Sequence, residues 1–434
     1  MTTSHRLSRR TLLRATAAAG GAAFLSSCAR GSGAAVDLAY WNFFGGSDGE
    51  LMVELVNEFR AEAPGVRVTD TTLDWGPPYY TKLAMACAGG RAPDLATLHA
   101  SRLATFGRDL LDEWDLDELA ARGVSVEEFP QPVLDRVLID GRLMALPLDT
   151  HPLVLYYNTD VCERAGLLAP DGTLAPIADA EQMLDAGRRA AEATGSIGIS
   201  LGIGESSHVW MLFWSLFRQL GGQMLLPDGG PAEVDRDAVV RSMAFLREMC
   251  DGTICSPTLD GQSAPAAFAS EQAGFLFVGP WEVTSAREAE IPFSMTQFPA
   301  LFGATPYVRA DSHSFVLPAQ AHVDPAARAA AYDMAVSMLR NSLVWATGGG
   351  HIPALSAVAA SPEYRAEQPI SNYREAAQVV EFDPEAYFSG SGSTLMSRAG
   401  QSLQGVATRA MTPEQGADDL IGWLDAQLTF GSPL

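Results

Sequence analysis

The 434-residue sequence has almost no lysine, few cysteines and no long apolar run. Its single lysine, Lys82, stands beside 28 arginines, a bias typical of GC-rich codon usage that indicates no mechanism. Acidic residues outnumber basic ones, and the formal net charge is -23. Because such a surface repels phosphate backbones, we do not expect nucleic-acid binding.

Cysteine is scarce, and no pair has the Cys-x-x-Cys spacing of a zinc site. Four cysteines follow the N-terminal region: Cys87, Cys162, Cys250 and Cys255. In an oxidising compartment they can form up to two disulfides, with Cys250 and Cys255 closest in sequence, or remain free and buried. No phosphate-binding loop or His-x-x-x-His helix occurs, so we expect no metal, no cofactor and no nucleotide chemistry.

The N-terminal region has the pattern of an export signal. Arg9 and Arg10 precede an apolar run over residues 15–25, which is too short for a bilayer that needs roughly 20 residues. Small residues then lead to Cys28, as in a bacterial lipoprotein signal, and the paired arginines resemble a twin-arginine signal. An ordinary secretory signal with a chance cysteine is the alternative.

We therefore predict that residues 1–27 are an export signal, that Cys28 is lipidated and that residues 28–35 are a tether. Removal of the signal takes away four arginines and no acid, so the formal charge becomes -27.

The chain after this tether alternates between strand and helix patterns. Such alternation predicts a parallel, right-handed α/β sheet. The expected strands are 36–44, 66–73 and 94–98, with helices at 50–63 and 81–88 between them. The apolar stripe of the first helix is expected to be Leu51, Met52, Leu55, Val56 and Phe59.

Residues 146–158 read as a hinge between two lobes. Pro147 and Pro152 favour a sheet edge or a connection between sheets over a core strand, because proline cannot donate to a sheet ladder. Just upstream, Asp140-Gly141 lies between two apolar runs and predicts a hairpin.

The rest of the chain is expected to divide between discontinuous lobes. Helices are predicted at 179–194, 208–220, 235–250 and 326–340, and strands at 274–278, 293–298 and 314–317. The first lobe is expected to comprise residues 36–147 and 293–320, and the second to comprise residues 148–292 and 321–434.

Short motifs along the mature chain resemble the extracellular solute-binding proteins of the carbohydrate class, the receptor components of ABC importers. These motifs are Tyr40-Trp41-Asn42, Gly89-Gly90-Arg91-Ala92-Pro93-Asp94-Leu95, Leu146-Pro147, Tyr156-Tyr157-Asn158-Thr159-Asp160, Gly279-Pro280-Trp281 and Gly348-Gly349-Gly350-His351-Ile352-Pro353. The resemblance implies a two-lobe periplasmic-binding-protein-like fold that closes on a ligand and performs no chemistry. It also implies a monomer, anchored outside the cytoplasmic membrane, with a carbohydrate ligand and an ABC permease as partners.

A sugar offers polar edges and C–H faces, so its site needs aromatic rings and charged or amide groups. Trp41 and Trp281 match motif positions of the family. The candidate ligand-binding residues are Trp41, Ser47, Asp48, Tyr79, His99, Ser101, His151, Glu205, Trp210, Trp281, Arg309 and His351. Trp75 is a further candidate ring, whereas Trp114, Trp214 and Trp345 are expected to pack in the interior.

Two alternatives stay open. Residues 45–49 fit the Gly-x-Ser-x-Gly pattern of a serine hydrolase with Ser47 as nucleophile, although one strand alone precedes it and no oxyanion segment is present. A binding protein for a polyamine, a metal chelate or a peptide would also suit the acidic chain.

Overall fold

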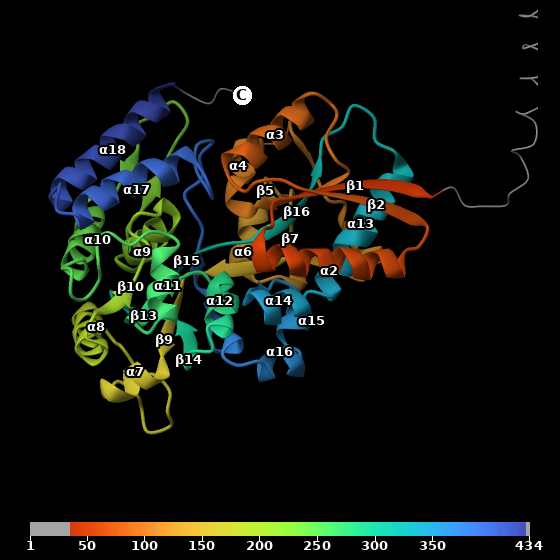
Figure 1. Cartoon of the computed structure of the whole chain (residues 1–434). Coiled ribbons are helices and arrows are strands. Elements are labelled where there is room, and N and C mark those ends of the chain that lie inside the picture. The colour runs from red at the N-terminus through yellow and green to blue at the C-terminus, as the bar shows by residue number, and fades with distance from the viewer. Residues whose placement is uncertain (1–34, 108, 431–434) are drawn as a thin grey trace, which may run out of the picture.

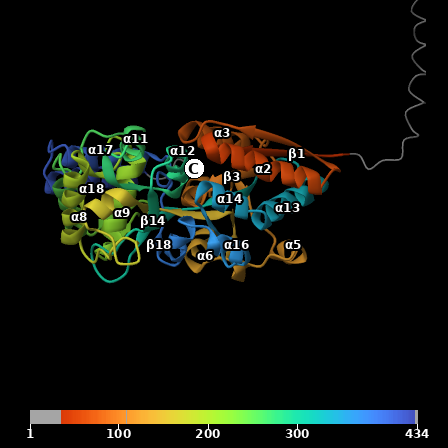
Figure 2. The same ribbon diagram turned by 60° about the horizontal axis from the view of Figure 1, so that its bottom comes forward.

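The computed structural model describes residues 35–107 and 109–430. Two lobes, each a sheet covered by helices, lie side by side (Figure 1), and the same division is visible from a second direction (Figure 2). The predicted signal, Cys28 and nearly all of the tether lie outside the described residues. Within the described residues, no helix has the length and apolar character needed to cross a membrane.

The sheet of the first lobe is built around β1 (Val36–Asn42). This strand pairs in parallel with β2 (Val66–Thr72) and with β3 (Leu95–His99), which confirms the predicted parallel start of the fold. A strand from far downstream, β16 (His313–Pro318), pairs antiparallel with β3. The short strands β4 (Leu111–Asp112) and β7 (Leu146–Pro147) complete the sheet beside β16.

Helices cover this first sheet with apolar faces. α2 (Gly46–Glu62) buries Met52, Leu55, Val56 and Phe59, the stripe that its sequence predicts. The other helices are α3 (Pro77–Ala88), α4 (Leu103–Phe106), α5 (Leu116–Ala121), α6 (Gln131–Val137), α13 (Pro325–Arg340) and α14 (Leu343–Gly349).

The second lobe has a mixed sheet with the order β10-β13-β9-β14. Its strands are β10 (Ile197–Ser200), β13 (Ala273–Val278), β9 (Val154–Asn158) and β14 (Phe293–Gln297). α9 (Ser206–Gln219) is buried on nearly all sides, because α17 (Thr394–Ala407) and other elements enclose it. The surrounding helices are α7 (Thr159–Arg164), α8 (Ala180–Thr194), α10 (Arg236–Met249), α11 (Ser263–Ala269), α12 (Val283–Glu288) and α18 (Pro413–Phe430).

A small sheet of crossing segments joins the lobes. It has the order β17 (Ile352–Pro353), β8 (Asp149–Pro152), β15 (Val308–Asp311) and β18 (Val380–Glu381). Since β7 belongs to the first sheet and β9 to the second, β8 carries the chain between lobes, as predicted for residues 146–158.

The predicted hairpin is present just before this crossing. β5 (Leu138–Ile139) and β6 (Arg142–Leu143) pair antiparallel. Asp140 and Gly141 have φ values of 48° and 75°, as a two-residue turn with both central residues at positive φ requires.

The predicted lobe boundaries are wrong in two places. β14 pairs with β9 in the second lobe, so residues 293–297 do not return to the first lobe. Conversely, α13 packs in the core of the first lobe, although residues 321–434 were assigned to the second. Apolar periodicity predicts a strand or a helix, but it does not say which sheet the element joins.

The described cysteines Cys87, Cys162, Cys250 and Cys255 are buried and unbridged. Of the two alternatives, the structure therefore has free thiols. Burial raises the pKa of Cys87 to about 11 and that of Cys162 to about 12. Such thiols stay protonated and are poor nucleophiles.

Candidate functional site

A cavity of about 430 Å³ opens between the lobes and is lined by residues of both. This cavity, the cleft, lies beyond the carboxyl ends of β1 and β3, where open α/β sheets commonly bind ligands. Its first-lobe side includes Phe43, Phe44, Asp48, Trp75, His99 and His313. Its second-lobe side includes Glu205, His208, Met211, Gln262, Trp281 and Met396, and the crossing strands add His151 and Arg309.

Half of the twelve candidate residues line this cleft. They are Asp48, His99, His151, Glu205, Trp281 and Arg309. They come from six separate stretches of sequence, and the fold alone brings them together.

Two of the candidate rings belong to the interior instead. Tyr79 is fully buried and donates to the carbonyl oxygen of Thr97 at 2.6 Å. Trp210 is also buried, and its Nε1 donates to Asp383 at 2.8 Å. The expectation that these rings face the cleft is wrong, because each indole or phenol satisfies its polar atom inside the core.

Trp41 and Ser47 also lie outside the lining of the cleft. Trp41 packs on the first-lobe core, with the ammonium of Lys82 5.2 Å from its ring centroid. Ser47 is in the first turn of α2, and no histidine of the described chain hydrogen-bonds to it. The hydrolase arrangement is therefore not assembled around Ser47 in the described residues.

Ser101 and His351 lie one layer beneath the cleft. Ser101 donates its backbone N–H to Asp311 at 3.0 Å, and its hydroxyl donates to the same carboxylate. His351 is fully buried, with Nε2 3.3 Å from each carboxylate oxygen of Asp48. Neither residue lines the cleft, although the Asp48 that His351 contacts does.

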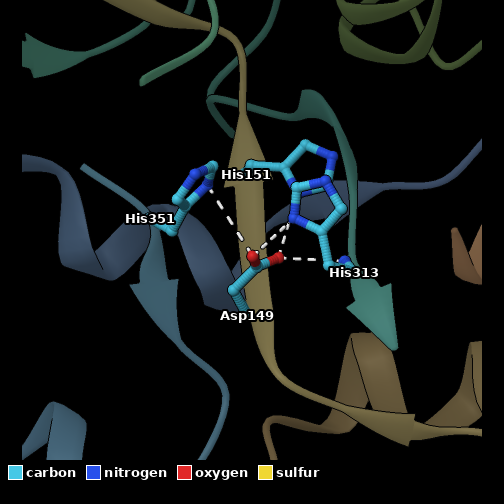
Figure 3. A group of neighbouring side chains, drawn as sticks. All are labelled: Asp149, His151, His313 and His351. Atoms are coloured by element: carbon cyan, nitrogen blue, oxygen red, sulfur yellow. Dashed lines mark hydrogen bonds and ion pairs between the residues drawn. The ribbon is translucent and has the colours of Figure 1, made fainter. Parts of the chain in front are cut away.

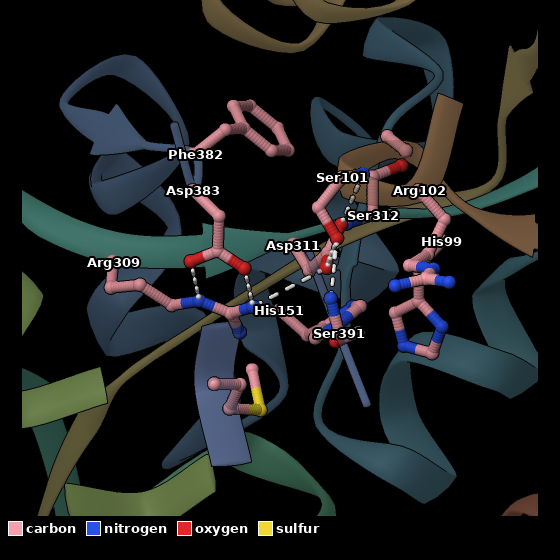
Figure 4. A network of polar contacts seen from close by, with 12 residues as sticks. His99, Ser101, Arg102, His151, Arg309, Asp311, Ser312, Phe382, Asp383 and Ser391 are labelled. Carbon is pink, nitrogen blue, oxygen red and sulfur yellow. Dashed lines mark hydrogen bonds and ion pairs between the residues drawn. The ribbon is translucent and has the colours of Figure 1, made fainter. Parts of the chain in front are cut away.

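Arg309 is the centre of a buried polar network that spans the crossing segments (Figure 4). It donates to Asp383 through two nitrogens, at 3.1 and 2.7 Å, and to Asp311 at 3.4 Å. Ser101 and Trp210 bind the two carboxylates from the first and second lobes. We call Ser101, Trp210, Arg309, Asp311 and Asp383 the arginine network.

A second buried group, the histidine cluster, comprises Asp149, His151, His313 and His351 (Figure 3). The Asp149 carboxylate lies 3.0 Å from Nδ1 of His151 and 2.7 Å from Nδ1 of His313. It also accepts from the indole Nε1 of Trp345 at 2.7 Å. Within the described residues, this is a set of side chains able to hold a metal ion.

Burial decides the charge of the rings that face the cleft. It lowers the pKa of His99 and brings that of His151 to about 4, so both rings are neutral near pH 7. Burial alone would raise the pKa of Asp311, but His99 and the Arg309 guanidinium hold it below its usual range. The cleft therefore offers the neutral imidazoles of His99 and His151, and the ionised Asp311 lies buried behind them.

Aromatic rings form the apolar part of the wall. Phe43 stacks on His99 with ring centroids 4.8 Å apart, and Trp281 lies edge-on to His151 at 6.1 Å. A Cβ atom at Gly279 would lie 1.9 Å from the Trp281 ring. Glycine in Gly279-Pro280-Trp281 thus lets the indole fold back over its own backbone.

Sequence reasoning missed several lining residues. Phe43 and Phe44 directly follow the Tyr40-Trp41-Asn42 motif, so their place at the strand end was a usable signal. Met211 and Met396 lie on helices whose apolar pattern indicates core alone.

Residues 54–370 match the family described as bacterial extracellular solute-binding protein. A binding protein of Brucella abortus (strain 2308) is 28% identical over 126 residues, which span 28% of this chain and 29% of that relative. The chain thus matches less than a third of the length of this curated relative.

Solved structures resemble the chain over most of its length. The GacH receptor of Streptomyces glaucescens has a TM-score of 0.74 at 16% identity, covering 91% of this chain and 99% of that one. Maltose-bound MalE3 of T. maritima has a TM-score of 0.75 at 18% identity, covering 91% and 100%. These matches confirm the predicted two-lobe fold, and the chain belongs to the bacterial extracellular solute-binding proteins, a family of binding proteins that act outside the cytoplasmic membrane.

Proposed function

We propose that this protein is a lipid-anchored receptor that binds a mono- or oligosaccharide in the cleft and delivers it to an ABC permease. The solute would lie between the lobes and contact both, so that binding favours closure about the crossing strands. The receptor would act as a monomer, and the permease would be a separate chain.

The observation that carries this proposal is the make-up of the cleft wall. Trp281 and Trp75 offer indole faces, whereas Asp48, Glu205 and Arg309 offer charged hydrogen-bonding groups. Aromatic faces attract the C–H faces of a sugar, and carboxylates or guanidinium bind its hydroxyls. Hydrogen bonds to charged groups contribute about 1.5–3 kcal/mol each, so a few of them with one stacked ring support micromolar binding.

The ligands of similar proteins agree with this choice. The GacH receptor was determined with acarbose, MalE3 of T. maritima with maltose, and the substrate-binding protein Lmo0181 of Listeria monocytogenes with cycloalternan. The volume of about 430 Å³ also falls in the class of small-molecule pockets, roughly 300–1,000 Å³.

The solute class is tested by thermal shift of the purified protein against a carbohydrate panel, followed by polyamines and short peptides. We expect a rise of several degrees with one saccharide, because a ligand that binds the native state alone stabilises it. A response to polyamines or peptides and to no sugar would contradict the carbohydrate assignment. Slow release of reducing ends that Ser47→Ala abolishes would favour the hydrolase instead.

The anchor is tested separately in cells. Cys28→Ala should move the protein from the membrane fraction to the soluble fraction, because several acyl chains on one cysteine hold a protein durably at a membrane. Incorporation of a labelled fatty acid should be lost in the same variant. Unchanged membrane association would contradict lipidation at Cys28.

A further inference from the structure

The histidine cluster lies at the floor of the cleft and is not explained by sugar binding. Asp149 and His151 come from β8, His313 from β16, and His351 from the segment between α14 and β17. All four side chains are at least nine-tenths buried. Figure 3 shows the carboxylate pointing between His351 on one side and the stacked rings of His151 and His313 on the other.

Asp149 carries the one formal charge of this cluster and has no permanent cation beside it. The ion pairs of Asp149 in the described chain involve His151, His313 and His351, with no arginine or lysine. A buried carboxylate is costly unless it is paired or bound to a metal ion. The cluster therefore combines an uncompensated anion with three groups that either bind a proton or coordinate a cation.

His351 turns Nδ1 toward the cluster and Nε2 toward Asp48. Its Nε2 lies 3.3 Å from both oxygens of Asp48, so Nε2 carries the hydrogen. Nδ1 is buried without a hydrogen-bond partner, 3.7 Å from the Asp149 carboxylate. A neutral ring would then aim its lone pair at an anion, an arrangement that a cation between the two atoms would make favourable.

Asp48 holds His351 in the manner that ligating histidines are usually held. A histidine that binds a metal commonly donates its second ring N–H to a carboxylate, which fixes the tautomer and the ring orientation. Gly349 makes room for this contact, because a Cβ atom there would lie 2.7 Å from His351 and 2.9 Å from Asp48.

The distances within the cluster suit a small divalent ion. The Asp149 carboxylate lies 3.0, 2.7 and 3.7 Å from the nearest ring nitrogens of His151, His313 and His351. Ligands about 2.1 Å from a zinc ion lie about 3.0–3.4 Å from one another. One candidate atom from each residue lies within 4.8 Å of all the others, so a shift of about an ångström would complete a tetrahedral set.

We propose that His151, His313, His351 and Asp149 bind one divalent transition-metal cation of the zinc class at the floor of the cleft. Imidazoles with one carboxylate suit zinc, cobalt or nickel, whereas calcium and magnesium prefer oxygen ligands throughout. The ion would neutralise Asp149 and, with Asp48 behind His351, leave no net charge. Since His151 and His313 also line the cleft, the ion would lie directly beneath the bound solute.

The test uses the protein produced without a polyhistidine tag, stripped with EDTA and kept free of sugar. Titration with Co²⁺ is followed by visible absorption, and titration with Zn²⁺ by calorimetry. We expect one equivalent of either ion to bind. His313→Gln and His351→Gln should each weaken metal binding at least about tenfold. Mutation of a residue that merely orients a metal ligand already lowers metal affinity by about 10–100-fold.

His322→Gln is the matched control, because His322 is exposed and lies outside the cluster. This variant should bind Co²⁺ and Zn²⁺ as the wild type does. Circular dichroism checks that each variant is folded. If a cluster variant does not fold, X-ray absorption at the zinc edge of the wild type counts the imidazole ligands, and three are expected. No uptake, uptake indifferent to both cluster substitutions, or fewer than three imidazoles would overturn the proposal, whatever the protein does with sugars.

Discussion

The arginine network and the histidine cluster are neighbouring groups of buried polar side chains, and they are built differently. In the arginine network, Arg309 pairs with both Asp383 and Asp311 (Figure 4). In the histidine cluster, Asp149 meets imidazoles and an indole (Figure 3). The arginine network contains a permanent cation, the Arg309 guanidinium. The histidine cluster instead has imidazoles, in which a metal ion can take the place of a proton.

This difference predicts a mainly structural role for the arginine network, although Arg309 also lines the cleft, and an ion-binding role for the histidine cluster. Two carboxylates around one guanidinium are held in a fixed geometry, and they connect Ser101 of the first lobe to Trp210 of the second. In the histidine cluster the carboxylate is hydrogen-bonded but faces no permanent cation, and Nδ1 of His351 has no hydrogen-bond partner. We therefore expect the first group to govern stability and the second to respond to added ions.

The largest effect should follow removal of the guanidinium. Arg309→Met leaves Asp311 and Asp383 buried without their cation, and breaking a buried pair in this way costs about 3–5 kcal/mol. Urea unfolding would measure the free energy of unfolding.

Arg67→Met is the matched control for Arg309→Met. Its partner Asp37 is at 2.8 Å, but the two side chains are 68% and 72% exposed, so the cost should be under about 1 kcal/mol. Equal losses in the two variants would contradict the structural role of the arginine network.

A smaller loss is expected at Asp149. Asp149→Asn keeps the shape, and its amide oxygen can still accept on one side. The amide N–H₂ would face donors such as Trp345 Nε1, and loss of that hydrogen bond costs about 1.5–3 kcal/mol. The loss should stay below that of Arg309→Met, because imidazoles can exchange tautomers, whereas the two carboxylates around Arg309 would both lose a permanent cation.

Asp149→Asn also tests whether the histidine cluster, and not the arginine network, responds to zinc. Zinc at a hundredfold excess over its Kd should stabilise the wild type by about 2.7 kcal/mol. Zinc should stabilise Asp149→Asn far less. An equal increase in the free energy of unfolding of both proteins would show that Asp149 does not bind the ion.

The sequence predicted the local parts of this architecture well. The Asp140-Gly141 hairpin, the α2 stripe and the crossing at residues 146–158 depend on neighbouring residues, so spacing and turn chemistry were sufficient. The lobe of β14 and of α13 depends on distant partners, and both were assigned wrongly.

The candidate site was predictable to a similar extent. Motif positions led to Trp281, which lines the cleft, but also to Trp41, which does not. His151, a candidate within the predicted hinge, lines the cleft as well. The ligands proposed for the ion lie on three separate segments, so no spacing rule for metal sites applies to them. Whether a ring lines a cavity or fills a core depends on packing, which one-dimensional patterns do not contain.

The indole of Trp281 lies against His151 of the histidine cluster and lines the cleft, so its removal tests the binding of the solute. Trp281→Ala should weaken saccharide binding by more than about 1 kcal/mol, as expected for a stacked aromatic anchor. Uptake of Co²⁺ and the free energy of unfolding should change little. Trp41→Ala is the control in calorimetry, because Trp41 lies outside the cleft. Equal saccharide affinities of the two variants would show that Trp281 does not contact the sugar.

The smallest effect is expected from a single methyl group beside this ring. Gly279→Ala places a Cβ atom 1.9 Å from the Trp281 indole, so the half-buried ring must turn away while the backbone stays relaxed at a φ of -73°. Overpacking costs about 1–3 kcal/mol, and we expect the lower end because the ring can move toward the cleft. Gly65→Ala, whose new Cβ meets no atom within 4 Å, is the control. Saccharide affinity should fall less than in Trp281→Ala, since a displaced indole still covers part of the sugar face. An affinity equal to that of Gly65→Ala would show that the orientation of this ring does not affect binding.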